Sequence, residues 1–575
     1  MSYDDAATTV EFKVFKNGLH ATEPGQKRQR VGPYLKVLST ASYENDDTVF
    51  VRLRFDSVTG ARITKLLPRA DLRKPLLIGE FLENHGYDYP HDRKNRLLVL
   101  LYLATVQPER HQIIKRGTGW VGDQFVLPDK IIGPDPLSVV YDGTDSEHNR
   151  YFGQARTLKG WQNHIAIPAA ASSRMMLAIT LPLAGTLLRH TNVESGVLHI
   201  VGPSSSGKTT VLIVKRSVKG RAVRGELGSW DATAPGVEGM ATEHNDLSAE
   251  FDEVALAGHD QQSIVQFTRK VAFKLSAGRG RILVKGHRKR LDCEWRLLAL
   301  SSGEIGLSEL PVGDGLQRIT GERLRLIDVP LGSKGQASIY DLEPLTAEEG
   351  ARRSEAIERA CATYYGRPLR VFLTNLTNDL EAGIRKVRKW MDEFYDMAGV
   401  PTTAGGGWER RFASRFALCY AAGRLAIEYG VLPWDSSLVG RSIVSCYRDA
   451  RGFLPDARAM LTQGLAELRR RVISPDILDL TELDGEISTH QLRAAAGYVR
   501  ETPKGMKFVA IKPDAFNRWF KTPGQSDLML NHLVAQRALL VQNGRPGLRT
   551  KQVKIAGIPE KKHYICIRKS SLRKL

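Results

Sequence analysis

Cysteine, aromatic residues and long apolar runs are all scarce in this chain. Its five cysteines are scattered singly, with no C-x-x-C pair, so neither a zinc site nor a disulfide framework is indicated. That pattern fits a reducing cytosol. The most apolar run, Met175 to Leu188, is too short to span a bilayer and predicts a buried helix. The first residues lack the basic start and apolar stretch of a signal peptide, so we expect a cytoplasmic protein.

Positive charge, by contrast, is abundant and concentrated. The chain has 83 Lys and Arg against 63 Asp and Glu, a net charge of +20. Such an excess favours a polyanionic partner, most often nucleic acid, although solubility alone is an alternative. From Glu501 to Leu575 there are 16 Lys and Arg against four Asp and Glu, a surplus of 12. Because more than half of the net charge falls in this tail, we expect DNA to bind there.

The most informative motif is G-x-x-x-x-G-K-[ST], which follows an apolar run at Val197–Val201 and precedes a helix-like run. Its glycines let backbone N–H groups surround a phosphate, at a helix N-terminus that favours negative charge. We expect Lys208 to reach the β and γ phosphates of ATP, and Thr209 to hold Mg²⁺. The alternative is a Gly/Ser-rich turn that imitates the motif. The expected nucleotide-binding residues are Gly202, Pro203, Ser204, Ser205, Ser206, Gly207, Lys208, Thr209 and Thr210.

ATP hydrolysis also needs a second, acidic site, and Asp252-Glu253 is the best candidate. We expect Asp252 to assist the metal and Glu253 to act as general base. A buried parallel strand should be almost wholly apolar, and Glu250 departs from that pattern just before the pair. The alternative is an ordinary acidic helix start.

A basic hairpin and a polar strand end come next. Six Lys and Arg fall between Arg279 and Arg290, with a glycine between two strand-like arms, a form suited to gripping a phosphate backbone. The alternative is a solvated surface hairpin. The strand that follows, Trp295–Leu300, leads to Ser302, which we expect to sense the γ-phosphate or to orient the attacking water. The expected DNA contacts on the hairpin are Lys285, His287, Arg288, Lys289 and Arg290.

Several arginines are candidates for completing the site. Arg318 or Arg325 could act as an arginine finger toward a neighbouring subunit's γ-phosphate, or either could form a surface ion pair. Arg411 and Arg415 lie four apart on one helix face, so one of them could fold over the nucleotide. A helix-surface charge pair is the alternative.

The alternation of elements predicts four domains. Residues 1–150 read as a β-rich N-terminal domain, with strands near Asp47–Phe55 and Ile63–Leu67. Residues 151–345 alternate helix and strand, which predicts an α/β fold with a parallel sheet. Residues 346–472 read as a helical lid. In residues 473–575, helices followed by a β-ribbon predict a basic winged-helix-like DNA-binding domain, with Lys551 and Lys554, and also Lys561 and Lys562, on or near the wing.

Taken together, these motifs resemble one bacterial family of phages, plasmids and genomic islands, long catalogued as a domain of unknown function and described as helicase-like. The resemblance runs from about Val31 to Gly452. Its relatives include proteins similar to minichromosome-maintenance helicases. It implies an AAA+ P-loop core with a helical lid and a C-terminal winged helix, acting on DNA as a hexameric ring. The residues that carry it are Thr118-Gly119-Trp120, Phe125–Pro128, Gly202–Thr209, Trp230–Thr233, Glu238-Gly239, Asn245-Asp246, Asp252-Glu253, Trp295 and Ser301–Glu304.

The sequence therefore predicts an ATP-dependent DNA helicase or translocase that serves the replication of a mobile element, with ATP and Mg²⁺ as cofactors. No primase module is visible, so priming would come from a separate primase or polymerase. The first alternative is an ATP-switched DNA-binding initiator or helicase loader without unwinding activity, which the acidic residue in the strand before Asp252 keeps open. A small-molecule kinase is a second alternative, disfavoured by the basic tail and the lack of an acceptor motif. A purely structural partner of a replication complex is a third.

Overall fold

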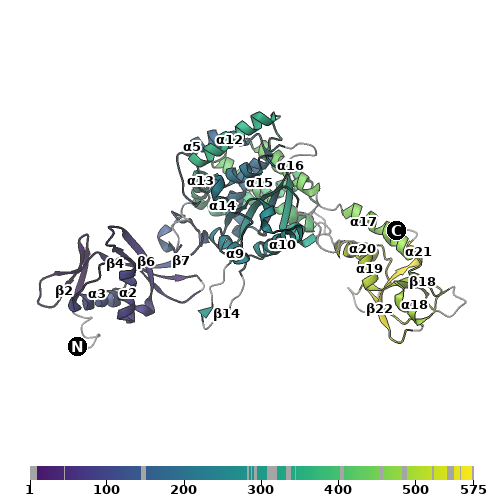
Figure 1. The fold of residues 1–575 in the computed structure, drawn as a ribbon, viewed down its shortest axis with the longest axis horizontal. Helices are drawn as coiled ribbons and strands as arrows, with labels where there is room; N and C mark the ends of the chain where they lie inside the picture. The colour runs from purple at the N-terminus through teal and green to yellow at the C-terminus, as the bar shows by residue number, and fades with distance from the viewer. Residues whose placement is uncertain are drawn as a thin grey trace.

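A computed structural model describes most of the chain, and Figure 1 shows three bodies that follow one another in chain order. Each described helix is too short or too polar to cross a membrane. The described residues are 10–44, 46–143, 151–280, 284–285, 288–289, 294–306, 320–331, 338–343, 345–401, 407–452, 457–481, 488–520, 523–540, 549–556 and 558–572.

The N-terminal body is built on two sheets. A three-stranded antiparallel sheet consists of β1 (Glu11–Phe15), β2 (Gly18–Thr22) and β3 (Gln29–Gly32). Helices α2 (Pro75–Asn84) and α3 (Arg93–Thr105) share an apolar core with these strands. The second sheet has the order β11-β7-β4-β5-β6, and its strands are β4 (Leu35–Tyr43), β5 (Phe50–Asp56), β6 (Arg62–Pro68), β7 (His111–Lys115) and β11 (Val139–Tyr141). The strands expected near residues 47–55 and 63–67 are thus present.

A small antiparallel sheet connects this body to the centre of the molecule. It consists of β8 (Gly119–Val121), β9 (Gln124–Val126) and β10 (Ile131–Ile132). Trp120 and Phe125 are buried in the central core rather than in the N-terminal one. The indole of Trp120 donates to the Thr186 carbonyl (2.7 Å), which fixes this hairpin on the central body.

The central body contains the expected parallel sheet, with the strand order β13-β16-β12-β17. Because alternate residues of buried parallel strands point to opposite faces, both faces carry apolar side chains and both are covered by helices. Helices α7 and α8 pack on one face, and α9 and α10 on the other. The elements are α7 (Ser173–Leu187), β12 (Gly196–Val201), α8 (Lys208–Ser217), α9 (Ala234–Glu243), β13 (Leu247–Phe251), α10 (Gln261–Ala277), β16 (Leu297–Gly303), α11 (Thr320–Arg325) and β17 (Leu326–Pro330).

The helices that follow β17 in the central body pack on the same side of the sheet as α7. Their apolar residues belong to the core that α7 and α8 form there. Helix α15 packs along both α7 and α14, and α16 packs on α7. The run from Met175 is a fully buried helix, as expected. The helices of this region are α12 (Ala347–Thr363), α13 (Arg367–Asn378), α14 (Leu380–Ala398), α15 (Gly407–Glu428) and α16 (Ser436–Gly452).

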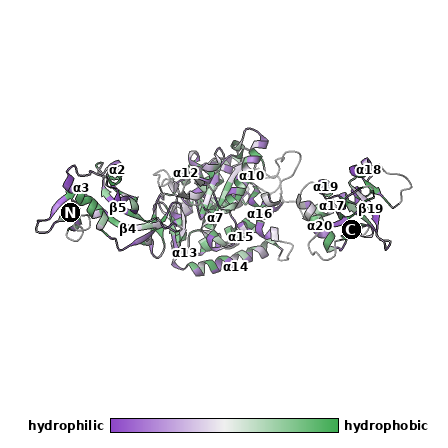
Figure 2. Ribbon diagram, turned by 90° about the horizontal axis from the view of Figure 1, so that it is seen from below, coloured by the Kyte–Doolittle hydropathy of each residue, from purple (hydrophilic) through white to green (hydrophobic). Residues whose placement is uncertain are grey.

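The C-terminal body has its own core around a five-stranded sheet, with the order β18-β19-β20-β22-β21. Helix α17 (Ala457–Val472) belongs to this body, since its Leu468 is buried in the core that α20 and β22 also form. The other elements are β18 (Ile477–Asp479), α18 (Thr489–Ala494), β19 (Gly497–Glu501), β20 (Lys507–Ile511), α19 (Pro513–Trp519), α20 (Pro523–Ala535), β21 (Lys551–Val553), β22 (Lys562–Arg568) and α21 (Lys569–Leu572). Figure 2 shows apolar stretches interleaved with polar ones in all three bodies.

Candidate nucleotide-binding site

The G-x-x-x-x-G-K-T loop lies between β12 and α8, at the carboxyl edge of the sheet. Gly207 has φ +95° and Ser205 has φ +59°, so the backbone turns through the left-handed region twice. A Cβ at Gly207 would come within 2.6 Å of Ile339, and one at Gly202 would collide with Leu331. The positive φ of Gly207 favours glycine there, and the buried side chains of Leu331 and Ile339, from beyond β17, leave little room for a side chain at either glycine.

Lys208 is held inside the loop. Its Nζ donates to the carbonyls of Gly202 (2.8 Å) and Pro203 (2.7 Å), and the side chain is buried. Burial lowers the pKa of Lys208, and the nearby carboxylates of Glu304, Glu253 and Asp252 oppose that lowering. The structure thus places the acidic pair close enough to Lys208 for their charges to affect its pKa.

The acidic pair and Ser302 meet across two neighbouring strands. Strand β13 pairs in parallel with β16, with Phe251 opposite Ser301. The next residues are then side by side, and the Ser302 hydroxyl donates to Asp252 Oδ1 (2.5 Å). The Glu253 N–H lies 3.2 Å from both Asp252 Oδ1 and Ser302 Oγ. Parallel pairing therefore assembles the three residues that the sequence predicted to act together.

Glu253 has a strained backbone. Its φ of 53° and ψ of 86° are unusual for a residue other than glycine, and such conformations cost about 1–3 kcal/mol each. The side chain also caps the following turn, since Oε1 accepts from the Ala255 N–H (3.3 Å). Strain of this kind clusters at functional sites, because it persists only where the surroundings impose it.

The residues present also fit Mg²⁺, a hard cation that prefers oxygen ligands. Within the described part of the chain, no group donates to Asp252 Oδ2, while Oδ1 is occupied by Ser302. Thr209, next to Lys208 in the first turn of α8, offers a hydroxyl. A carboxylate oxygen and a hydroxyl are the donor types that the phosphate-bound ion takes in P-loop sites.

Glu250, which departs from the apolar pattern of its strand, is a structural residue. It is buried on β13, and two lysines from α8 and the turn after it reach it: Lys215 Nζ at 3.0 Å and Lys219 Nζ at 3.1 Å. The same lysines donate to the Ala249 and Ser248 carbonyls. The cationic neighbours lower the pKa of Glu250, whereas burial lowers the pKa of Lys215 to about 8 and that of Lys219 to about 7. The strand is therefore fully buried despite its acidic residue.

An indole and an imidazole hold the serine that precedes Ser302. The Trp230 indole donates to Ser301 Oγ (2.7 Å), and His199 Nδ1 lies 2.9 Å from the same oxygen. His199 belongs to β12 and Ser301 to β16, so this buried contact joins the P-loop strand to the strand that carries Ser302.

Sequence reasoning missed Glu358 and Arg224. Glu358 on α12 accepts from the Thr210 hydroxyl (2.6 Å), directly after the phosphate loop. Arg224 donates to both Glu358 oxygens (3.1 and 3.0 Å), and this carboxylate, with a smaller effect from Asp252, raises the pKa of Arg224. No local sequence motif predicts either residue, because the contacts join segments more than 130 positions apart.

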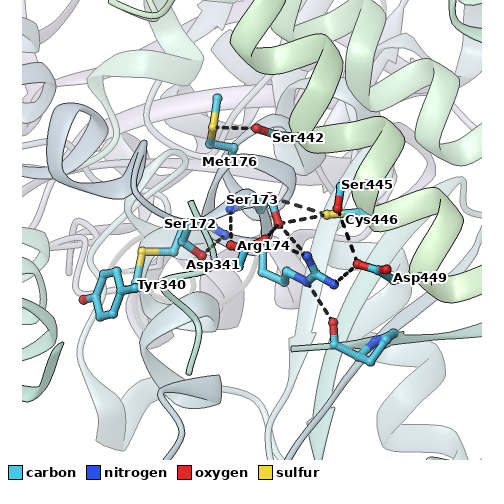
Figure 3. Close-up of polar contacts among 12 residues, drawn as sticks. Ser172, Ser173, Arg174, Met176, Tyr340, Asp341, Ser442, Ser445, Cys446 and Asp449 are labelled. Atoms are coloured by element: carbon cyan, nitrogen blue, oxygen red, sulfur yellow. Dashed lines mark hydrogen bonds and ion pairs between the residues drawn. The ribbon is translucent and has the colours of Figure 1, made fainter. Parts of the chain in front are cut away.

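A buried arginine, Arg174, also acts near the loop, and Figure 3 shows its contacts. It donates to the Pro330 carbonyl (2.8 Å), to Asp341 (2.9 Å) and to Asp449 (2.5 Å). Asp341 in turn accepts from the Ser173 hydroxyl (2.5 Å). Arg174 thus ties the start of α7, the end of β17, the segment behind the phosphate loop and helix α16 together.

The structure does not bring Arg325 or Arg411 to the P-loop of their own chain. Arg411 pairs with Glu194 (2.9 Å), which lies before the start of β12. The phosphate loop lies after the end of β12, about 20 Å away along the strand. Arg325 donates to Gly321 and stacks over Phe273 (4.6 Å), at the same amino edge. Arg415 is buried and donates to the Leu324 and Ser195 carbonyls.

The expected DNA-contacting residues are only partly described. Strands β14 (Val284–Lys285) and β15 (Arg288–Lys289) pair antiparallel, so the hairpin expected there is present as backbone. His287, Arg290 and the candidate finger Arg318 lie outside the described residues. In the C-terminal body, β21 and β22 pair antiparallel as expected. Lys551 is partly exposed on β21, and three more lysines lie beside or on the two strands, partly or fully exposed: Lys554, Lys561 and Lys562.

Comparisons with known proteins agree with this architecture. The family described as "Domain of unknown function (DUF927)" matches residues 11–289, just under half of the chain. A solved structure titled "SCCmec type IV Cch - active helicase" is similar over 98% of this chain and 99% of that chain, with a TM-score of 0.62 and 16% identity. A second, described as the apo structure of the C-terminal region of NrS-1, covers 72% of this chain and 92% of that chain, with a TM-score of 0.26 and 8% identity. No curated protein sequence matches. The chain therefore resembles a family without an assigned function and has the fold of the first structure.

Proposed function

We propose that this protein is an AAA+ ATPase that uses ATP hydrolysis to translocate on or unwind DNA, in the replication of a mobile genetic element. The observation that carries the proposal is the meeting of Lys208, Asp252, Glu253 and Ser302 at the carboxyl edge of one parallel sheet. The fold shared with an active helicase over almost the whole chain supports it.

The strand order supports the AAA+ class. The strand that carries Ser302 lies between the P-loop strand and the acidic strand, as expected of such ATPases. On the far side of β13, Ser229 forms an isolated parallel bridge to Asp252. The sheet therefore has room for a further parallel strand at that edge. In the C-terminal body, α19 and α20 follow β20 and precede the β21–β22 ribbon, and the three strands pair in the order β20-β22-β21, which supports a winged helix.

In the proposed reaction the chain's own residues hold and orient the reactants. The loop's N–H groups and Lys208 bind the phosphates, Lys208 exchanging two carbonyl partners for phosphate oxygens. Glu253 accepts a proton from the attacking water, and Ser302 positions that water and Asp252. Mg²⁺, held by Thr209 and Asp252, would neutralise charge on the phosphates.

An arginine from a neighbouring subunit completes the proposed site. Arg325, one of the two candidate fingers beside Arg318, lies at the amino edge, opposite its own phosphate loop, so its contact with a γ-phosphate would have to occur across a subunit interface. This arrangement supports a ring, which we take to be a hexamer. The basic hairpin of β14 and β15 follows α10 and precedes β16, and its movement would be coupled to Ser302.

The division into four domains also stays a proposal. We move two of its boundaries according to the apolar core that each segment shares. Residues 119–132 share the central core, and α17 shares the C-terminal one. The central body would then begin near Gly119 and end near Gly452.

The test is ATP hydrolysis with and without DNA, together with strand displacement on a forked duplex. Glu253→Gln should lower the hydrolysis rate by about 10²–10⁴-fold, the usual contribution of a general base, while ATP binding is retained. Lys208→Ala should lose ATP binding, and Arg288→Ala/Lys289→Ala/Arg290→Ala should lose DNA stimulation and unwinding. Hydrolysis by Glu253→Gln at the wild-type rate would refute the assignment of the base.

The same assay distinguishes the initiator or loader alternative. An acidic residue in the strand before Asp252 favours that alternative on sequence grounds, but the lysine partners of Glu250 explain its presence there. ATP-dependent DNA binding without strand displacement would favour the alternative, whereas stimulation by a small acceptor in place of DNA would indicate a phosphotransferase.

A further inference from the structure

Helices α2 and α3 share a core with one face of the five-stranded sheet of the N-terminal body, and described residues of the opposite face form a separate, smaller apolar cluster over β4, β7 and β11. Val51, Leu53 and Phe55 of β5 point into the core with α2 and α3. The intervening residues, Arg52 and Arg54, point to the opposite face and are partly exposed. We call this opposite face the outer face.

Positive charges are paired on the outer face. Lys36 of β4 stands directly opposite Arg54, and Arg52 stands two positions before Arg54 on the same strand. Like charges directly opposite one another destabilise a sheet. Among the described residues, no carboxylate forms a salt bridge with these three: Arg54 donates to Thr64 (3.3 Å) and Arg52 to Gln112 (3.1 Å).

Arg52 retains unused hydrogen-bonding capacity. Its Nε is buried and has no partner among the described residues, and burial together with the charge of Arg54 lowers its pKa. Two carboxylates near the cluster have other partners: Asp56 pairs with Arg62 (2.7 Å), and Asp142 accepts from the Tyr43 hydroxyl (2.9 Å) with Arg116 4.0 Å away. The cluster therefore has a net positive charge that an anion would stabilise.

Aromatic rings adjoin the cluster on the same face. Phe50, two positions before Arg52, is partly exposed and meets Tyr43 edge to face at 5.7 Å. The Arg116 guanidinium stacks over Tyr43 at 4.5 Å, and Leu66, opposite Arg52, packs beside them. Basic side chains that track a backbone, next to rings on which bases can stack, are the recurring features of single-strand binding surfaces.

We propose that the outer face binds single-stranded DNA, with Lys36, Arg52 and Arg54 on the phosphates and Phe50 and Tyr43 on the bases. This inference rests on the proposed function and adds a contact that neither the basic hairpin nor the basic tail supplies. It also gives the N-terminal body a role in holding the strand.

The test measures binding of a fluorescent oligothymidylate to the full-length protein across a salt titration. Lys36→Gln/Arg54→Gln should make the slope of log K against log salt shallower by about 1.4, from two phosphate contacts at about 0.7 each. Phe50→Leu, which keeps the apolar packing, should weaken binding by about tenfold with little change of slope. The matched control is Lys65→Gln/Arg69→Gln, which removes the same charge from exposed positions of the same body outside the outer face.

The outcomes separate this inference from the proposed function. Wild-type affinity and slope in Lys36→Gln/Arg54→Gln, or equal losses in the control, would overturn the outer-face site while leaving the helicase proposal intact. ATP hydrolysis without DNA should be unchanged in all three variants. A wild-type protein that binds no DNA would overturn both.

Discussion

Glu250 and Glu253 stand three positions apart, yet their surroundings give them opposite tasks. Glu250 is buried, and its charge is balanced by Lys215 and Lys219, so it fastens β13 to α8 and the turn after it. Glu253 comes directly after the strand, in a strained turn beside Ser302, where we propose that it acts as the general base. Residue type alone does not distinguish the two acids, because burial and charged partners set the properties of each carboxylate.

Arg174 offers a residue-scale prediction. Arg174→Met should destabilise the central body by about 3–5 kcal/mol, because Asp341 and Asp449 would lose their shared buried cation. It should also raise the KM for ATP, since Asp341 adjoins Ile339, which supports Gly207. Hydrogen exchange of α7 under urea, together with steady-state ATPase assays, would measure both effects. Arg385→Met, which removes an exposed helix-surface ion pair, is the control, and an equally large loss in that variant would contradict the argument.

At the scale of elements, the functional edge depends on how α8 is fastened to β13. Lys215 lies in the last turn of α8, and Lys219 follows four positions later, just after the helix ends. Both side chains therefore point to the same side, and both reach Glu250 and the neighbouring carbonyls. The helix that begins with Lys208 and the strand that leads to Asp252 are therefore joined by buried ionic contacts. This attachment keeps the phosphate loop and the acidic pair in a fixed relation.

Glu250→Leu tests that attachment. Leaving Lys215, Lys219 and the more distant Arg216 (3.8 Å) without their carboxylate should cost about 3–5 kcal/mol, whereas adding Lys215→Met and Lys219→Met should recover part of the loss. Urea denaturation followed by tryptophan fluorescence would compare the single variant with the triple one. A triple variant less stable than Glu250→Leu would show that the lysines contribute mainly through the Ala249 and Ser248 carbonyls.

At the scale of the whole molecule, the described apolar residues divide into separate cores along the chain. The largest are one N-terminal core, two cores on the faces of the central sheet and two in the C-terminal body, while two smaller clusters lie on the N-terminal five-stranded sheet and beside β8 and β9. The position of α17 matters here, since Leu461, Leu465 and Leu468 pack with the C-terminal elements. The natural place to divide the chain is therefore before α17 rather than after it.

A chain that ends at Gly452 should remain soluble and keep ATP hydrolysis, but bind DNA more weakly and with a shallower salt slope. A chain that ends at Arg471 should aggregate, because it exposes the apolar face of α17. Light scattering and a salt titration of DNA binding would compare the two. An unchanged salt slope in the shorter chain would mean that the basic tail does not contact DNA.

The local sequence was sufficient for features that depend on neighbours along the chain. The phosphate loop, the parallel sheet, the buried helix after Ser172 and the β21–β22 ribbon all follow from glycine spacing, apolar periodicity and turn residues. Asp252-Glu253 is recognisable by its position after a strand. The phosphate loop and the acidic pair can therefore be located from local sequence alone.

Only the tertiary structure decided which distant groups surround the phosphate loop and the acidic pair. Glu358 and Arg224 reach the loop through long-range contacts, and Arg174 joins elements separated by up to 275 positions. It also decided that Glu250 is neutralised and that Arg411 lies away from its own phosphate loop. Local patterns report on periodicity and turns, whereas burial and ion pairing arise when the strands take their order in the sheet.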